Sequence, residues 1–126
     1  MEYLIDSNVL IDYVAERFTN DQLEKLDQIF DLSFSISIIT KIETLGFNAK
    51  SEEIDKLKLF LNAASIIALN DDVVQQTIDL KKSVKMKTPD AIIAATAIVN
   101  DLIIVSRNTV DFVRIPGVKV INPHEF

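Results

Sequence analysis

The sequence predicts an α/β fold with a parallel central sheet that helices cover on both faces. Short apolar runs alternate with longer segments whose apolar residues recur at helical spacing, throughout the 126 residues. Residues 102–105 are apolar without interruption, which is typical of a strand that is covered on both sides. We therefore expect a three-layer αβα sandwich around a parallel sheet of four to five strands, formed by residues 1–126 as one domain.

Strands are expected wherever a short apolar or alternating run lies between two turn or helix-start signals. Such runs occur five times along the chain, at residues 3–5, 34–38, 65–69, 102–105 and 118–121. The second run alternates between apolar and polar residues, as a strand with two different faces does. A helical segment separates each strand from the next, so the strands are expected to pair in parallel.

Helices are expected to begin at residues that cap helix N-termini well and to continue with apolar residues at helical spacing. In chain order these starts are Asp6 or Ser7, Thr19, Thr40, Ser51, Asn70 and Thr88, followed by a short helix after residues 106–109. The start at Thr88 is the strongest, because Pro89 and then Asp90 occupy the first turn. Residues 91–99 are apolar nearly all round, which predicts a helix that is buried on most sides.

The composition excludes several kinds of chemistry. The chain has no Cys and a single His, His124, which excludes a Cys/His zinc site and a cysteine nucleophile. Two glycines are too few for a phosphate-binding or dinucleotide-binding glycine motif. The net charge of −6 argues against passive, charge-driven binding of nucleic acid, but not against a nuclease whose acids hold divalent cations.

The chain also lacks the patterns of membrane insertion and secretion. No apolar run approaches the ~20 residues of a membrane-spanning helix, and Met1 leads directly into the first expected strand without room for a signal peptide. The expected location is therefore the cytoplasm.

Three carboxylates, Asp6, Glu43 and Asp90, are the main candidates for chemistry. Each has a structural alternative: Asp6 as a helix cap, Glu43 in a capping box with Thr40, and Asp90 as an ordinary first-turn acid. Asp6 and Glu43 follow strands and should share one edge of the sheet, whereas Asp90 lies in a helix-to-helix connection that the sequence alone does not place. Carboxylates that met there would repel unless Mg²⁺ or Mn²⁺ compensated them, and such a site activates water and clamps a phosphodiester.

Four segments in this order resemble a PIN-domain ribonuclease, and most closely the VapC-type toxins of toxin–antitoxin pairs. They are residues 6–12, Thr40 with Glu43, residues 88–97 and residues 106–117, so the resemblance covers essentially the whole chain. It implies an αβα sandwich with its acids at one sheet edge and a Mg²⁺- or Mn²⁺-dependent endoribonuclease activity. It also implies an RNA substrate, a cognate antitoxin and a homodimer.

The resemblance assigns roles residue by residue. Asp6 and Asp90 match the two acids that hold the metal most directly, and Glu43 matches the third, as a ligand or as a group that orients water. The fourth acidic position falls on Asn108, an uncharged and weaker ligand. Asp111, one helical turn further on, is the alternative fourth ligand or a cap of its short helix.

Further polar residues flank these positions and are candidates for binding substrate. Ser7 and Asn8 adjoin Asp6, although capping is the favoured role of Ser7; Ser106, Arg107 and Lys87 adjoin the other acids. Four lysines before Asp90 could receive RNA phosphates or could simply form a solvated face, namely Lys81, Lys82, Lys85 and Lys87. Asp12 is expected to be solvated and His124 to lie in the tail, and some apolar residues are expected to form interfaces, namely Ile29, Phe30, Phe34, Ile54 and Phe60.

Two rival functions stay open at this point. An acid-pocket phosphotransfer protein would use Asp6 as its nucleophile or phosphorylation site, but it needs a second acid where this chain has Asn8. A PIN-fold module that binds RNA or protein with weak or lost catalysis is the other, and Asn108 is the residue that favours it.

Overall fold

The computed structural model describes residues 2–126 and is built on a sheet of five parallel strands. The strands are β1 (Tyr3–Ile5), β2 (Phe34–Ser37), β3 (Ser65–Ile67), β4 (Ile103–Val105) and β5 (Lys119–Ile121). The helices are α1 (Ser7–Val14), α2 (Asn20–Asp31), α3 (Ile38–Leu45), α4 (Ser51–Ala63), α5 (Asp71–Ser83), α6 (Thr88–Asn100), α7 (Thr109–Val113) and the short 3₁₀ helix η1 (Pro123–Glu125). All five expected strands form, each at the predicted place.

The strand order β3-β2-β1-β4-β5 determines where the sheet opens for a ligand. From β1 the chain builds outward through β2 and β3, and it then returns to add β4 and β5 on the other side of β1. Tyr3 of β1 therefore pairs with Ile103 of β4, and Ile5 with Val105. The loops after β1 and β4 leave the sheet in different directions at this switch point, which is where open α/β sheets bind ligands.

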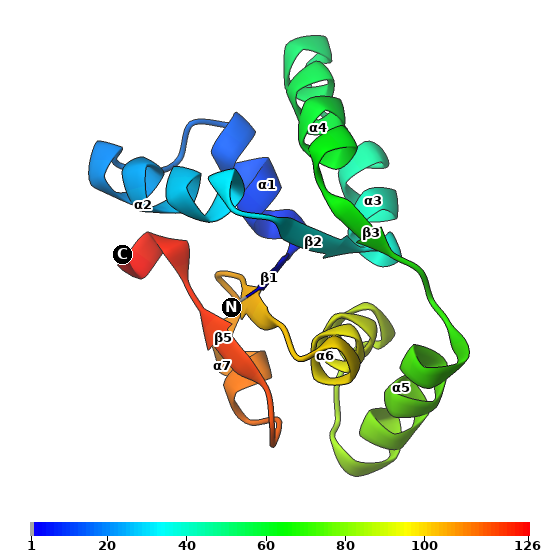
Figure 1. Ribbon diagram of the computed structural model, residues 1–126. Helices are drawn as coiled ribbons and strands as arrows, with labels where there is room; N and C mark the ends of the chain where they lie inside the picture. Colours follow the sequence, from blue (N-terminus) through cyan, green and yellow to red (C-terminus); the bar gives the residue numbers. More distant parts are fainter. Residues whose placement is uncertain (1) are drawn as a thin grey trace.

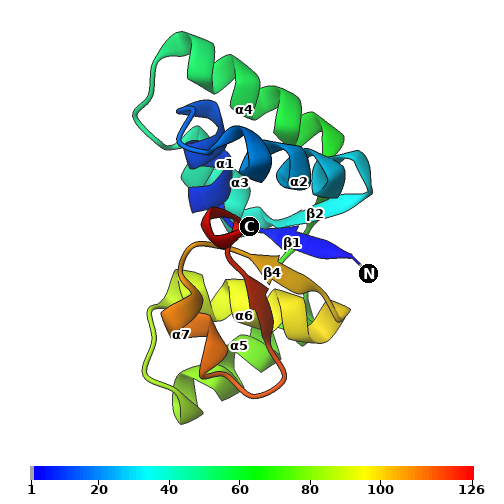
Figure 2. The same ribbon diagram turned by 90° about the vertical axis from the view of Figure 1, so that its left-hand side faces the viewer.

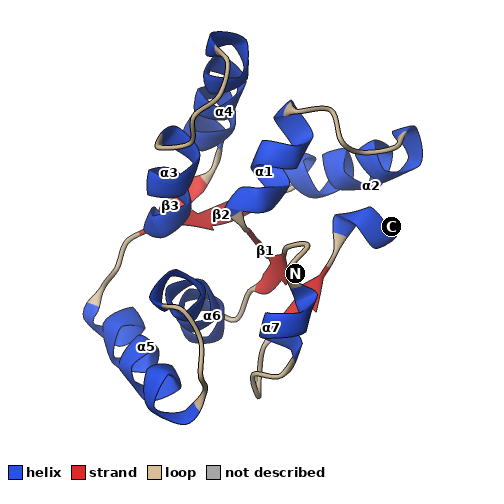
Figure 3. Cartoon of the chain, turned by 180° about the vertical axis from the view of Figure 1, so that it is seen from behind, coloured by secondary structure: helices blue, strands red, loops and turns tan. Residues whose placement is uncertain are grey.

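Two apolar cores hold helices on the two faces of the sheet, which confirms the three-layer architecture. Helices α1 to α4 lie on one face and α5 to α7 on the other (Figures 1 and 2), and Figure 3 shows the short strands between them. One core includes Ile5, Leu26 and Leu57, and the other includes Leu4, Ile93 and Phe112, all of them buried. Neighbouring residues of β1 thus face opposite cores, as the alternation of a strand requires.

The apolar residues expected at interfaces contribute to the first of these cores, and an interface role stays a prediction for those that are partly exposed. Ile29 and Phe34 are buried, and Phe30, Ile54 and Phe60 are partly buried against them. The ring of Tyr13 packs edge-on against Phe30 and Phe60. These aromatic rings fill the space between α1, α2 and α4 and pack the three helices against one another on this face of the sheet.

The capping residues of two helices differ from the prediction, by three residues at α3 and by one at α6. Ser37, not Thr40, caps α3, because the Ser37 hydroxyl accepts a hydrogen bond from the backbone N–H of Ile39 at 3.2 Å. Thr40 lies inside the helix, fully buried, and its hydroxyl has no hydrogen-bond partner in residues 2–126. Helix α6 begins at Thr88 with Lys87 as the capping residue, so Pro89 and Asp90 still fall in its first turn.

Across residues 2–126, no helix is both long and apolar enough to span a bilayer.

Candidate active site

The carboxylate of Asp6 lies at the switch point and is held by three neighbours. Asp6 directly follows β1 and caps α1, and it is 5% exposed. Its Oδ1 accepts a hydrogen bond from the backbone N–H of Ser7 at 2.8 Å. Its Oδ2 accepts from the hydroxyl of Ser106, after β4, at 2.8 Å and from the side-chain amide of Asn8 at 3.2 Å. The structure therefore brings Asp6, Asn8 and Ser106 together. Asp6 caps helix α1 through Oδ1, and hydrogen bonds from Asn8 and Ser106 fix the orientation of its carboxylate through Oδ2.

Burial gives this carboxyl an unusual affinity for protons. Loss of solvent raises the pKa of Asp6 to about 6, from an ordinary value of 3.8, and the hydrogen bonds from Ser106 and Ser7 only partly oppose this effect. The negative charges of Glu43 and Asp90 raise the pKa further. Both other predicted acids thus lie close enough to act on Asp6 electrostatically, although burial is the larger cause of the raised pKa.

Glu43 reaches the same edge from α3 through Ser7. The Ser7 hydroxyl donates a hydrogen bond to Glu43 Oε1 at 3.1 Å, which links the start of α1 to the second turn of α3. The capping box with Thr40 is therefore wrong, since Thr40 is not the capping residue of α3. Capping by the Ser7 side chain is also wrong, because the helix cap is Asp6.

Asp90 and Asp111 lie together at a hollow of about 560 Å³. Desolvation and the charge of Asp111 raise the pKa of Asp90, whereas the charge of Lys87 lowers it. Asn108 also lines this hollow, and its backbone N–H donates to the Ser106 hydroxyl at 3.0 Å. The hollow therefore joins α6 and α7, and it places the two alternatives for the fourth ligand near Asp90.

The residues at this edge fit a hard divalent cation by their chemistry. Every candidate ligand offers carboxylate or amide oxygen, the donors that Mg²⁺ and Mn²⁺ prefer. Within residues 2–126 no three acidic or imidazole side chains are already grouped as a complete cation site. The carboxylates instead interact pairwise through their charges. Glu43 and Asp90 raise the pKa of Asp6, and Asp111 raises the pKa of Asp90.

A comparison with known protein families agrees with this arrangement. The family model described as the PIN domain matches residues 3–118, nearly the whole chain. The chain belongs to the PIN-domain family. The family includes nucleases that hydrolyse RNA, and the family prediction made from the four sequence segments is confirmed.

Solved structures of toxin–antitoxin complexes have the same fold as this PIN domain. A chain of a toxin–antitoxin complex from Klebsiella pneumoniae is 31% identical, with 98% of this chain and 99% of that chain covered and a TM-score of 0.79. VapBC2 from Rickettsia felis, bound to a promoter DNA fragment, is 22% identical, with coverages of 97% and 98% and a TM-score of 0.81. FitAcB from Neisseria gonorrhoeae is 21% identical over 100% of both chains, with a TM-score of 0.76. No curated protein matches the chain significantly in sequence.

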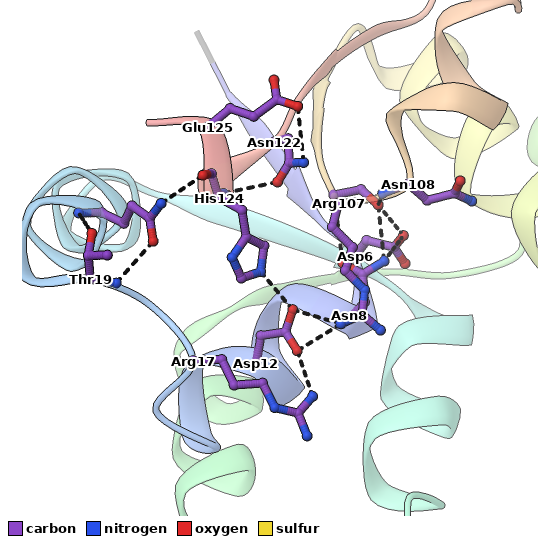
Figure 4. Close-up of polar contacts among 12 residues, drawn as sticks. Asp6, Asn8, Asp12, Arg17, Thr19, Arg107, Asn108, Asn122, His124 and Glu125 are labelled. Carbon is purple, nitrogen blue, oxygen red and sulfur yellow. Dashed lines mark hydrogen bonds and ion pairs between the residues drawn. The ribbon is translucent and has the colours of Figure 1, made fainter.

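Asp12 and His124 have structural positions in the PIN domain that the sequence analysis missed. Asp12 is not solvated: it is 1% exposed on the inner side of α1. His124 is not a loose tail residue, since its Nε2 lies 2.9 Å from Asp12 Oδ2 (Figure 4). Its ring also stacks on Phe18, with 4.3 Å between the ring centroids. Asp12 lies three residues after Val9, on the buried face of the helix, and that spacing was the available signal.

Two basic residues near the site were also missed or left without a role. Arg17 donates to Asp12 Oδ1 at 3.0 Å, at the end of α1. Arg114 donates to the backbone oxygens of Lys85 at 2.6 Å and of Asp111 at 3.1 Å, and so ties the loop before α6 to α7. Arg17 lies only five residues after its partner Asp12, so this pair was within reach of a local pattern, whereas Arg114 bonds to backbone oxygens that no side-chain pattern marks.

Proposed function

We propose that this PIN domain is a metal-dependent endoribonuclease and the toxin of a toxin–antitoxin pair. The observation that carries the proposal is the buried carboxylate of Asp6 at the switch point, electrostatically coupled to Glu43 and Asp90. The 31% identity over nearly the full length of a chain from a toxin–antitoxin complex supports the toxin role. The proposal treats the chain as one nuclease domain that acts in the cytoplasm, where its RNA substrate is found.

In this proposal Asp6, Asp90 and Glu43 hold Mg²⁺ or Mn²⁺, with Asn108 or Asp111 as a further ligand. The bound cation supplies charge that lowers the pKa of water and offsets the negative charge developing on the phosphate. The electrostatic coupling of these carboxylates supports this role, since a cation between them would offset their repulsion.

The chain's own residues prepare the site for that chemistry. Ser106 and Asn8 donate to Asp6 Oδ2, so this carboxylate is oriented before any ligand arrives. Ser7 donates to Glu43, which holds a second carboxylate toward the same edge. Such fixed hydrogen bonds around metal-binding carboxylates commonly contribute about 10–100-fold to affinity or activity.

The positive side chains around the hollow give a route for an anionic substrate. Lys85, Lys87 and Arg114 line the hollow together with Asp90 and Asp111. Cations placed next to a cation-binding acid cluster can receive the phosphates that flank a cleaved bond, so a chain of net charge −6 can still bind RNA locally.

The proposal includes a cognate antitoxin that occludes the site and a homodimer. The neighbouring structures that carry the names VapBC and FitAcB support a protein partner. An acid-pocket phosphotransfer reaction has less support, because the amide of Asn8 occupies the position of the second acid and bonds to Asp6 and Ser106.

Chelation tests the proposed function. The purified chain should cleave a mixed pool of single-stranded and structured RNAs in Mg²⁺ or Mn²⁺, and EDTA should abolish the cleavage until excess cation is restored. The measurement is the appearance of shorter RNA on denaturing gels, with heat-inactivated protein as the control for contaminating nuclease. Cleavage that persists at the same rate in EDTA would contradict the metal-dependent reaction.

A further inference from the structure

The buried carboxylate of Asp12 gathers three basic side chains next to the site. Arg107 Nη1 lies 2.9 Å from Oδ1 and 3.0 Å from Oδ2, and Arg17 Nη1 lies 3.0 Å from the same Oδ1 (Figure 4). His124 Nε2 approaches Oδ2 at 2.9 Å. All three ion pairs found in residues 2–126 end on this one carboxylate. A single buried acid therefore orients two guanidinium groups that come from opposite ends of the chain.

The cluster around Asp12 has a net positive charge, and some guanidinium N–H groups in it donate no hydrogen bond to protein. Two guanidinium groups stay charged at any working pH, so with one carboxylate their sum is at least +1. The side chains of Arg17 and Arg107 are 56% and 52% exposed. In the described part of the chain, Nε and Nη2 of these two arginines donate no hydrogen bond to protein. These two guanidinium groups are planar, half exposed and held in place by Asp12, which suits them to bind a phosphate group.

Asn8 and Ser106 link the carboxylate of Asp6 to this cluster. The backbone N–H of Arg107 donates to Asn8 Oδ1 at 3.2 Å, and the amide of Asn8 donates to Asp6 Oδ2 at 3.2 Å. Ser106, directly before Arg107, donates to the same oxygen of Asp6. The position of Arg107 is therefore fixed relative to Asp6 through its backbone as well as through its side chain.

A second hollow of about 430 Å³ continues from the cluster along α1 and the loop before α4. Arg17, Lys50, Phe47 and the acid Glu53 are among the residues that line it. Phe47 is 41% exposed, although it is a large aromatic residue. A hollow with two cations, one acid and an accessible aromatic ring can take a single nucleic-acid strand, whose phosphates meet the cations and whose bases stack on the ring.

We infer that Arg17 and Arg107 form a phosphate subsite for an RNA strand, and that Asp12 is the positioning residue that holds both guanidinium groups toward it. The inference rests on the proposed function and adds to it the residues that bind the strand beside the reacting phosphodiester. His124 secures Asp12 from the side of the C-terminal helix η1.

The salt dependence of RNA binding tests this subsite. A short labelled single-stranded RNA of mixed sequence is titrated by fluorescence anisotropy with the Asp6→Asn chain, which retains the cluster, at constant Mg²⁺ and several KCl concentrations. Each lost phosphate contact lowers the slope of log affinity against log salt by about 0.7. Arg17→Ala and Arg107→Ala should each show this decrease, and Arg17→Lys should restore much of it because the charge is kept.

The matched control is Lys119→Ala. Lys119 is exposed and begins β5, at the edge of the sheet opposite the site, so its removal changes net charge equally without touching the cluster. In steady-state cleavage by the otherwise unchanged chain, Asp12→Asn should raise KM severalfold and leave kcat within about twofold, a split that simple loss of folded protein does not produce.

Each outcome supports or overturns the inference. If the unaltered chain cleaves RNA but the arginine variants and Lys119→Ala have equal salt slopes, the subsite is wrong while the proposed function stands. The subsite is also wrong, and the proposed function again stands, if Arg17→Ala weakens the binding of a protein partner but leaves the binding of RNA unchanged. If the unaltered chain neither cleaves nor binds RNA, the proposed function and the subsite both fail.

Discussion

Replacing Asp6 by Asn is expected to reduce RNA cleavage by more than about 100-fold, because loss of a metal ligand should exceed the effect of losing a group that only supports one. Asn keeps the size of the side chain and can still accept the hydrogen bond from the N–H of Ser7. The fold should therefore remain intact. The measurement is the rate of RNA cleavage in saturating Mg²⁺, together with a circular dichroism spectrum.

The same substitution is expected to stabilise the chain when no divalent cation is present. The folded pKa of Asp6, about 6, lies above its ordinary value of 3.8, so the contribution of this carboxyl to stability is complete below pH 3.8 and is lost as pH rises through 6. A neutral amide avoids that loss but gives up the hydrogen bonds that Asn8 and Ser106 donate to Oδ2, so we expect the free energy of unfolding at pH 7 to rise by only about 1 kcal/mol. Urea denaturation in EDTA measures it.

Asp101→Asn is the matched control for both measurements. Asp101 is exposed and lies before β4, at the opposite edge of the sheet, and its backbone has a φ of 53°, which Asn also adopts readily. This variant should cleave RNA normally and have unchanged stability. Equal cleavage by Asp6→Asn and Asp101→Asn would exclude Asp6 from the catalytic machinery.

Removing the carboxylate of Asp12 is expected to cause the largest loss of stability. Asp12→Ala leaves His124 and two guanidinium groups without their anionic partner and opens a void behind them. Breaking a fully buried ion pair costs about 3–5 kcal/mol; because the two arginines are half exposed, we expect about 2–3 kcal/mol here. Urea denaturation at pH 7 measures the loss, with Asp55→Ala, an exposed acid on α4, as the control.

The effect of Asp12 should depend on pH in a defined direction. Burial raises the pKa of its carboxyl, but the hydrogen bonds from His124 and Arg17 and the charge of Arg107 lower it overall below its ordinary value of 3.8. Its stabilising contribution is therefore complete above pH 3.8 and is lost as pH falls through the lower folded value. The difference in free energy of unfolding between the unaltered chain and Asp12→Asn should therefore shrink as the pH falls. A difference in free energy that grows on acidification would contradict the ion-pair role of Asp12.

Local sequence patterns were sufficient to predict the layers of this fold. Apolar runs between helical segments located every strand, and the apolar segment after Asp90 marked the central helix α6, where residues from Ala91 to Ala97 are buried. Strand and helix ends were less well predicted. Ser37 caps α3 although Thr40 has the stronger capping pattern, because the chain turns out of β2 as soon as the strand pairing ends.

The site was only partly predictable because much of it depends on distant contacts. Asp6 and Glu43 could be placed at one edge from the strands that precede them, but the approach of Asp90 required the packing of α6 beneath the sheet. The contact of Asp12 with His124 joins positions 112 residues apart, and that with Arg107 joins positions 95 residues apart. No local pattern contains such pairs, and the burial of Asp12 becomes evident only when α1, the loop after β4 and η1 meet.

Binding of Mn²⁺ by calorimetry, in the unaltered chain and in Asp6→Asn, tests most directly that these acids form a cation site. The unaltered chain should bind Mn²⁺ at pH 7, and below pH 6 its apparent affinity should fall by up to about tenfold per pH unit, because a proton competes for Asp6. Asp6→Asn should bind much more weakly, and Asp101→Asn should bind normally. Equal Mn²⁺ binding by the unaltered chain and Asp6→Asn would contradict the cation site.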